Sequence, residues 1–258
     1  MTKRRRDYHP FIDSYMDDIR SGKIRACKEI KQAMDYVEFK LDNPDVIIRG
    51  DMIDKAVELI ERYFEYKLLN WELFVLALIH CYYKSDDTVV FDEFLLVMGT
   101  GNGKNGFISP VAWYLTTHYH GVREYNVDIV ANSEEQAQTS FNDVYNVLDR
   151  TWNKSKKFFY KTKQIIVNLR TNSYIKYNTS NAKTRLGKRA GCLIFDEILE
   201  YEDWTVINAF TASFGKKKHS RKFFITTNGY VRGGPLDDLL DLAKQVLSEE
   251  VKELGFLP

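Results

Sequence analysis

The sequence predicts an α/β fold of three layers, in which a mainly parallel central sheet is covered on both faces by helices, preceded by an N-terminal helical segment. From Val89 onward, short apolar runs alternate with helical patterns, and this alternation is typical of parallel sheets with helical crossovers. Before Val89, apolar residues recur at three- and four-residue spacings between charges, which indicates amphipathic helices.

The composition is that of an ordinary globular chain. Its 258 residues are enough to bury a sizeable core. The formal net charge of +1 indicates neither a nucleic-acid partner nor its absence, so only the distribution of charge is informative. The cysteines Cys27, Cys81 and Cys192 form no CxxC pair, which argues against a disulfide framework or zinc site. No apolar run has the length of a membrane span or follows the N-terminus as a secretion signal would, so we expect an intracellular protein without membrane contact.

The first third of the chain is expected to be helical. Residues 11–41 and 51–69 have amphipathic spacing, and the Asn-Pro and Gly of 41–51 separate them. Asp51 is a possible cap for the second of these helices. Residues 70–84, "NWELFVLALIHCYYK", are apolar nearly all round and predict a buried helix.

Beyond Val89, strands and helices are expected in turn. The expected strands are residues 89–98, 125–133, 173–180, 191–198 and 221–228. The expected helices are residues 104–121, 134–149, 204–214 and 235–254. Ser133 and Gln136 have the spacing of a capping box at the start of the second of these helices.

A glycine-rich loop, "VMGTGNGKNG" at 97–106, lies between an expected strand and an expected helix. Its glycines allow backbone turns in which consecutive amides point at phosphate oxygens; they are Gly99, Gly101 and Gly103. Lys104 would add a cation, and the helix that follows would add its positive end. The loop departs from the phosphate-binding pattern at Met98, where a glycine belongs, and at Asn105, where a magnesium-binding Ser or Thr belongs. A flexible surface loop is the alternative interpretation.

Two acids follow the apolar run "CLIF". Asp196 and Glu197 are expected at the carboxyl end of a buried strand, the edge at which ligands bind in open α/β folds. Asp196 could hold magnesium through its water shell, and Glu197 could orient and deprotonate an attacking water. The alternative is an ordinary strand end with solvated acids.

A second polar strand end is "ITTNG". Thr226, Thr227 and Asn228 could sense the γ-phosphate and report its state, although a plain Asn-Gly turn would look the same. The "HYH" at 118–120 is not expected to hold a metal, because side chains two residues apart on a helix diverge.

Basic residues gather in three clusters, which could contact phosphate backbones without reading sequence, or supply an arginine finger. A solvated loop face is the alternative for each. The clusters are Lys154, Lys156, Lys157, Lys161 and Lys163; Lys183, Arg185, Lys188 and Arg189; and Lys216, Lys217, Lys218, Arg221 and Lys222.

Taken together, these blocks resemble the ATPase domain of tailed-phage terminase large subunits, the motors that thread viral DNA into a preformed capsid. "FIDSYMDDIRSGKIRACKEI" is similar to the family's helical opening, "NWELFVLALI" to its adenine-side segment and "GNGKN" to its Walker A loop. "YNTSNAKTRLGKRAGCLIFDEILEYEDW" resembles the stretch through Walker B, and "FFITTNGYVRGGPLDDLL" resembles the coupling motif and the helix after it. The resemblance implies a P-loop NTPase fold of the RecA-like (ASCE) class.

The resemblance assigns roles to single residues. Lys104 becomes the phosphate lysine, Asp196 the magnesium-side acid and Glu197 the catalytic glutamate. The implied coupling element is Thr226, Thr227 and Asn228. The implied nucleotide-binding residues are Glu72, Gly99, Thr100, Gly101, Asn102, Gly103, Lys104 and Asn105.

Three of these residues depart from the family's pattern. Asn105 replaces the Ser or Thr at the metal, although its carbonyl can still face magnesium. Thr100 stands where an arginine is frequent, and Glu72 stands where a glutamine near the adenine is frequent. Arg185 and Arg189 are then the candidate arginine fingers.

The resemblance implies an ATP- and Mg²⁺-dependent motor for double-stranded DNA. Its implied partners are the portal protein, the small terminase subunit and further copies of itself in a ring, in the host cytoplasm at the procapsid. A degenerate nucleotide-binding scaffold module and a helicase-like translocase are the alternatives. The expected parts are a helical lead-in at 1–66, an ATPase core at 67–235, and a last helix with the start of a linker at 236–258, without nuclease activity.

Overall fold

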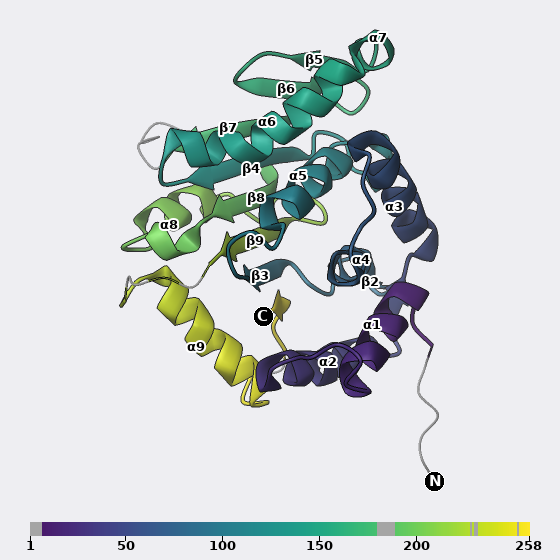
Figure 1. Ribbon diagram of the computed structural model, residues 1–258, viewed down its shortest axis with the longest axis vertical. Coiled ribbons are helices and arrows are strands. Elements are labelled where there is room, and N and C mark those ends of the chain that lie inside the picture. The colour runs from purple at the N-terminus through teal and green to yellow at the C-terminus, as the bar shows by residue number, and fades with distance from the viewer. Residues whose placement is uncertain (1–6, 180–188, 228, 230–231, 252) are drawn as a thin grey trace.

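The computed structural model describes residues 7–179, 189–227, 229, 232–251 and 253–258 (Figure 1). Within these residues an eight-stranded sheet forms the centre, with strand order β10-β3-β9-β8-β4-β7-β6-β5. Pairing is parallel from β10 to β7, and β6 and β5 complete the sheet antiparallel. The strands are β3 Glu93–Val97, β4 Asn126–Ala131, β5 Phe159–Lys161, β6 Ile165–Asn168, β7 Ser173–Thr179, β8 Ala190–Asp196, β9 Arg221–Thr226 and β10 Phe256–Leu257.

Helices flank this sheet, which confirms the predicted α/β class (Figure 1). α5 and α6 lie side by side, with α6 over β4 and β7, and α8 packs on β8. The α-helices are α1 Pro10–Arg20, α2 Lys28–Leu41, α3 Gly50–Phe64, α4 Asn70–Leu78, α5 Lys104–Leu115, α6 Glu134–Arg150, α7 Trp152–Ser155, α8 Thr205–Thr211 and α9 Pro235–Leu247. None of the described helices is long and apolar enough to cross a membrane.

The central strands are buried on both faces. All seven residues of β8 are buried, as expected for an inner strand of a parallel sheet covered by helices. Stacked aromatic rings join neighbouring strands: Phe94 lies 4.7 Å from Phe223, and Phe195 lies 5.3 Å from Phe224, between ring centroids. These pairs place the core along β3, β9 and β8, the strands that carry the candidate site.

Several boundaries differ from the sequence-based expectation. The helix expected at 70–84 ends at Leu78, and Cys81–Tyr83 forms β2, which pairs antiparallel with β1, Val46–Ile48. An apolar run of this kind fits a buried helix and a buried strand equally well. Asp51 does not cap α3, which begins after Arg49 without a side-chain cap.

Two further helices end earlier in the chain than the sequence predicts. The helix expected at 104–121 ends at Leu115 and is followed by a 3-10 turn, η1 at His118–His120. The last helix ends at Leu247 rather than at 254. The capping box at Ser133 and Gln136 is confirmed, because each side chain accepts a hydrogen bond from the other's backbone.

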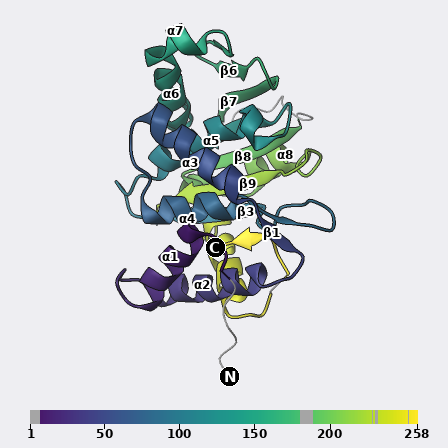
Figure 2. The same ribbon diagram turned by 90° about the vertical axis from the view of Figure 1, so that its right-hand side faces the viewer.

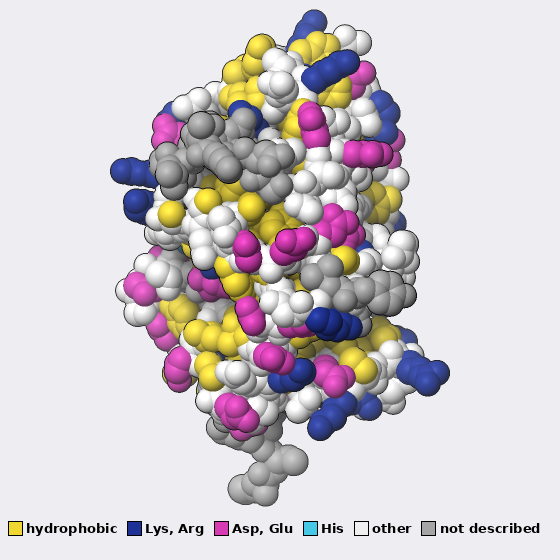
Figure 3. Space-filling view, turned by 90° about the vertical axis from the view of Figure 1, so that its left-hand side faces the viewer, with side chains coloured by type: hydrophobic (Ala, Val, Ile, Leu, Met, Phe, Trp, Pro, Cys, Tyr) yellow, Lys and Arg dark blue, Asp and Glu magenta, His cyan; other side chains and the backbone are white. Residues whose placement is uncertain are grey.

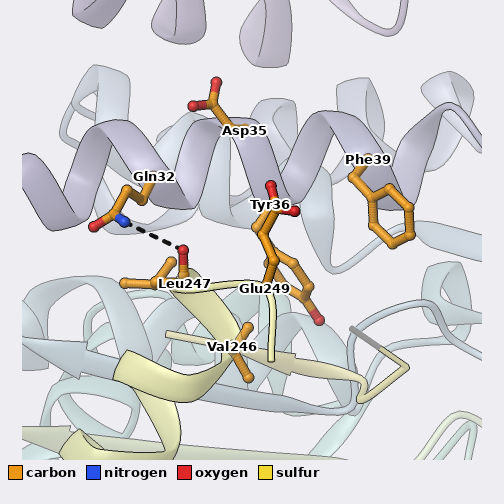
Figure 4. Close-up of a pocket in the computed structure, with 7 residues that line it drawn as sticks. All are labelled: Gln32, Asp35, Tyr36, Phe39, Val246, Leu247 and Glu249. Carbon is orange, nitrogen blue, oxygen red and sulfur yellow. Dashed lines mark hydrogen bonds between the residues drawn. The ribbon is translucent and has the colours of Figure 1, made fainter. Parts of the chain in front are cut away.

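The first and last segments of the chain lie together below the sheet (Figures 1 and 2). The Gln32 side-chain amide of α2 donates to the Leu247 carbonyl at 3.2 Å, across a hollow between α2 and α9 (Figure 4). The Tyr36 hydroxyl donates to the Leu254 carbonyl at 2.6 Å. The division at residues 66 and 235 stays a prediction, and these contacts join the first of its parts to the last.

A buried arginine holds the amino-terminal edge of the sheet together. Arg221, fully buried at the start of β9, donates to the Ile79 carbonyl at 2.6 Å and the His219 carbonyl at 2.7 Å. The hydroxyls of Tyr125 and Tyr82 accept further bonds. The guanidinium thus joins β9 to the end of α4, to β2 and to the start of β4.

The packing of α5 includes an unusual donor. Pro110 lies inside this helix and has no N–H for the carbonyl of Gly106, four residues earlier. The Tyr66 hydroxyl donates to that carbonyl at 2.7 Å instead. The segment between α3 and α4 therefore completes the hydrogen bonding of α5 in its second turn.

The stability of the fold should depend on pH through His80. Burial, followed by the charges of Arg221 and Arg49, lowers the pKa of this histidine to about 3, against the opposing effect of its bond to the Leu76 carbonyl. In the unfolded chain the same imidazole takes up a proton near pH 6.5. The stability that the neutral, buried His80 contributes is therefore complete above pH 6.5, and it is lost as the pH falls from there toward the folded pKa of about 3. We expect His80 to account for about 2 kcal/mol of lost unfolding free energy between about pH 7 and pH 5.

Urea denaturation of wild type and His80→Asn at both pH values checks this. The variant should be less stable at pH 7 but should lose less on acidification. His118→Asn, at a half-buried position, is the matched control. An unchanged pH dependence in His80→Asn would contradict the assignment.

A double-mutant cycle tests the Tyr66 hydroxyl. Tyr66→Phe should cost about 1 kcal/mol of unfolding free energy, the net value of one hydrogen bond. In a Pro110→Ala background the restored N–H can donate to Gly106, so the same substitution should cost almost nothing. Equal costs in the two backgrounds, measured by urea denaturation, would show that the hydroxyl does not replace the missing donor.

Candidate nucleotide site

Three strand ends bring the predicted site residues to one edge of the sheet. β9 lies between β3 and β8. The parallel register pairs Val97 with Thr226 and Ile225 with Asp196. The glycine loop after β3, the threonines of β9 and the acids of β8 therefore meet at the carboxyl edge, where open α/β sheets bind ligands.

The loop has the backbone that its glycines predict. Gly101 and Gly103 have φ of +81° and +82°, in the left-handed region that favours glycine. Residues 99–103 are exposed, and Gly103 immediately precedes α5. Met98 donates its N–H to the Thr226 carbonyl at 3.0 Å and has no positive φ. No glycine is therefore needed at the position where the sequence departs from the pattern.

Lys104 and Glu197 lie close together. Lys104 opens α5 and is only 6% exposed. Its Nζ lies 3.8 Å from Oε1 of Glu197, whose side chain is 25% exposed. A buried ammonium at a helix start, beside an exposed glycine loop, is suited to an anion with several oxygens.

Asp196 is buried, with one carboxylate oxygen satisfied. Its Oδ2 accepts a hydrogen bond from the Asn105 amide at 3.1 Å. Its Oδ1 is buried without a hydrogen-bond partner among the described residues. Burial, and then the charge of Glu197, raises the pKa of Asp196 to about 6. A buried, unsatisfied carboxylate oxygen is the kind of group that a cation or its water would satisfy.

Ser140 is a neighbour that sequence reasoning missed. The Asn105 amide also donates to its hydroxyl at 3.3 Å, and Ser140 is fully buried on α6. The contact joins α5 to α6, 35 residues apart, and no local motif marks it. With Nδ2 facing Ser140 and Asp196, Oδ1 of Asn105 is the atom left to face a cation.

Glu197 has an uncommon backbone conformation, φ 48° and ψ 59°. For a residue with a side chain this costs on the order of 1 kcal/mol, and such residues cluster at functional sites. Two hydrogen bonds, to Thr226 at the end of β9 and from the next residue, hold the turn. The Thr227 N–H donates to Oε2 of Glu197 at 3.1 Å, and the Leu199 N–H donates to the Thr226 hydroxyl at 3.1 Å.

Glu72 lies beside the loop but has another partner. Its carboxylate accepts the Leu69 N–H at 2.7 Å, which caps α4. The side chain is 3% exposed, and its Oε1 would lie 3.9 Å from a Cβ at Gly103. Burial raises its pKa. Its predicted place near an adenine stays a prediction.

The candidate arginine finger is not part of this chain's own site. Arg189 is exposed and precedes β8, so it lies roughly 20 Å along the strand from Asp196. Arg185 and Asn228 lie outside the described residues. Among the residues that the structure describes, no group of three or more His, Cys, Asp or Glu could hold a metal.

Comparisons with known proteins bear on the family and the fold. The family model "Terminase large subunit, ATPase domain" matches residues 70–245. No curated protein matches the chain. The crystal structure of the HK97 bacteriophage large terminase is similar, with a TM-score of 0.67 at 18% identity over 82% of this chain and 43% of that one. The large terminase ATPase domain of Thermus phage P74-26 gives a TM-score of 0.46 at 13% identity, over 66% of this chain and 69% of that one.

The likeness to the HK97 protein confirms the predicted RecA-like fold, and this chain spans 43% of that protein's length. The family match covers two thirds of the chain, and it includes the loop, the acids and the threonines that meet at the sheet edge. The chain therefore belongs to the family of terminase large subunit ATPase domains.

Proposed function

We propose that this chain is the ATP-hydrolysing motor of a viral DNA-packaging complex, and that it moves double-stranded DNA into a procapsid. The observation that carries the proposal is the convergence of the glycine loop, Lys104, Asp196 and Glu197 at one sheet edge. The family match supports it independently. ATP and Mg²⁺ are the proposed ligands.

The loop and Lys104 bind the polyphosphate. In this proposal the backbone amides of the exposed loop 99–103 and of the start of α5 face the phosphate oxygens, with the Asn102 N–H released from the Gly99 carbonyl that it contacts at 3.3 Å, and Lys104 adds a positive charge. Thr100 and Asn102 belong to this loop and contribute their backbone amides. Magnesium would be held by Asp196, with Oδ1 of Asn105 facing it or its water, and it would neutralise charge on the phosphates. The buried Oδ1 of Asp196, which has no hydrogen-bond partner in the described part of the chain, fits this role.

Glu197 is the proposed base for the attacking water. In the structure its carboxylate is shared between Lys104 and the Thr227 N–H. Phosphate oxygens would compete for Lys104, which would leave Glu197 oriented by Thr227 alone and able to take a proton from water. Thr226 and Thr227 hold the turn that carries Glu197. A change in the position of Glu197 at the phosphate would therefore also displace the end of β9. This is the proposed coupling path, together with Asn228.

The assembled motor is proposed to be a ring. Arg189 cannot reach its own chain's site, so it or Arg185 would act on a neighbouring copy as an arginine finger. The portal protein and the small terminase subunit are the other proposed partners, in the host cytoplasm at the procapsid. Glu72 is proposed to lie on the adenine side of the site.

Two substitutions separate binding from hydrolysis. Lys104→Ala should abolish ATP binding, because it removes the buried cation at the phosphates. Glu197→Gln should bind ATP as wild type does and hydrolyse it on the order of 10²- to 10⁴-fold more slowly, as expected for loss of a general base. Isothermal titration calorimetry with ATP measures binding, and an assay of released phosphate measures hydrolysis.

The same measurements test the alternative of a scaffold module with a degenerate site. Wild type that binds no ATP at millimolar concentration would overturn the motor proposal for this chain. Hydrolysis by Glu197→Gln at the wild-type rate would show that another group is the base. Strand separation in a duplex-unwinding assay would instead indicate a helicase-like translocase.

Asn105→Thr tests the role of residue 105 at the metal. A threonine hydroxyl can keep the bond to Asp196 and is a better magnesium ligand than an amide. We expect half-maximal ATP hydrolysis at a several-fold lower Mg²⁺ concentration, and Asn105→Ala should shift it the opposite way. Ser140→Ala is the matched control for packing behind Asn105. An Mg²⁺ dependence identical in all four proteins would contradict the assignment.

A further inference from the structure

The charges of the chain are strongly segregated. Residues 150–195 contain twelve of the 37 Lys and Arg residues and none of the 36 Asp and Glu residues. The rest of the chain therefore has an excess of acids, although the total is nearly neutral. A segment of one charge within a neutral chain indicates a polyanionic partner.

Part of this segment forms a compact surface at one end of the molecule. α7 runs into β5, and the Leu169 N–H donates to the Phe158 carbonyl at 2.8 Å, which brings the end of β6 beside the end of α7. We define the basic face by the exposed cations around this contact, Lys154, Lys156, Lys157 and Arg170. Figure 3 shows Lys and Arg side chains among hydrophobic ones at this end, the end at which Figure 1 places α7, β5 and β6.

These cations are available to a partner. The described ion pairs of this region join Arg150 to Glu65 and Lys161 to Asp149, and none of the four cations of the basic face takes part in one. Lys161 differs from them. Its ammonium lies 3.5 Å from the centroid of the Tyr145 ring, and its side chain is 5% exposed. Lys161 therefore anchors β5 to α6, while the basic face stays open to solvent.

Exposed apolar groups lie between the cations. Phe158 is 43% exposed and Leu169 is 54% exposed, at the contact between α7 and β6. On an edge strand, lysines can be explained entirely by their role in preventing pairing with another strand. Lys154, Lys156 and Lys157 lie on or beside α7 instead, so that explanation does not cover them.

The basic face is separate from the candidate nucleotide site. Arg170 precedes β7, so it lies toward the amino ends of the parallel strands, whereas the loop and the acids lie at the carboxyl edge of β3 and β8. The other described lysine cluster is less available. Lys217 pairs with Glu124 at 3.8 Å, and Lys218 pairs with Asp87.

We propose that the basic face binds the phosphate backbone of double-stranded DNA. The three lysines and the arginine form no ion pair with another described residue, and only Lys157 contacts a ring, that of Phe158 at 4.9 Å. They supply contacts that do not depend on base sequence, as transport of a whole genome requires. The inference rests on the proposed function, since it names the surface of the motor that holds its DNA.

The test measures binding of the full chain to a short fluorescent duplex of mixed sequence by anisotropy, over a series of salt concentrations. In K154Q/K156Q/K157Q, loss of three phosphate contacts should weaken binding about 100-fold at low salt and reduce the slope of log K against log salt by about 2.7. The matched control K216Q/K217Q/K218Q removes the same charge from the other cluster and should bind like wild type. Circular dichroism establishes that both variants are folded.

Several results would overturn the proposal. These are no duplex binding by wild type, an equal loss in the control variant, or an unchanged salt slope in K154Q/K156Q/K157Q. Tighter binding of the matching single strand, lost in Phe158→Ala, would indicate base stacking in place of duplex contact. Hydrolysis of ATP without DNA, measured in the same samples, should be equal in wild type and both variants. Failure of the motor proposal would appear there, independently of DNA binding.

Discussion

The pairing of β9 between β3 and β8 is the constraint on which the candidate site depends. It sets Thr226 beside Val97 and Ile225 beside Asp196, so that loop, threonines and acids share one edge. A shift of one residue would turn the buried Thr226 to the other face of the sheet and remove its bond to the Leu199 N–H. The stacked phenylalanines of these strands oppose such a shift.

The buried charged groups at the two edges of the sheet have different hydrogen-bond partners. At the carboxyl edge, Lys104 faces Glu197 and Asn105 faces Asp196, and Oδ1 of Asp196 has no hydrogen-bond partner among the described residues. At the amino edge, the two terminal nitrogens of Arg221 bond to carbonyls, to hydroxyls and to Nε2 of His120, while its Nε is buried without a hydrogen-bond partner in the part of the chain that the structure describes. The bonds of the Arg221 guanidinium join several elements and so stabilise one arrangement, whereas Oδ1 of Asp196 at the carboxyl edge is a group that a cation or its water would satisfy.

A feature could be predicted from the sequence where the residues that specify it are adjacent in the chain, and not where they are far apart. The glycine loop, the acids at the end of β8 and the Ser133–Gln136 cap are each encoded within a few adjacent residues, and the structure places all three as expected. Ser140 could not be found in this way, since its contact with Asn105 crosses two helices. Cys81–Tyr83 was mistaken for helix because burial on all sides erases the period that separates helix from strand. β5 and β6 were missed because each is only three or four residues long and half exposed.

The bond between Tyr66 and Gly106 makes two distant positions dependent on each other. A proline at position 110 is tolerated because a hydroxyl from outside the helix replaces the donor that it removes. In a lineage, the hydroxyl at 66 could therefore arise first without harm, whereas the proline arising first would leave a backbone carbonyl without its donor. The order of the two substitutions thus matters for the stability of the helix that begins at Lys104.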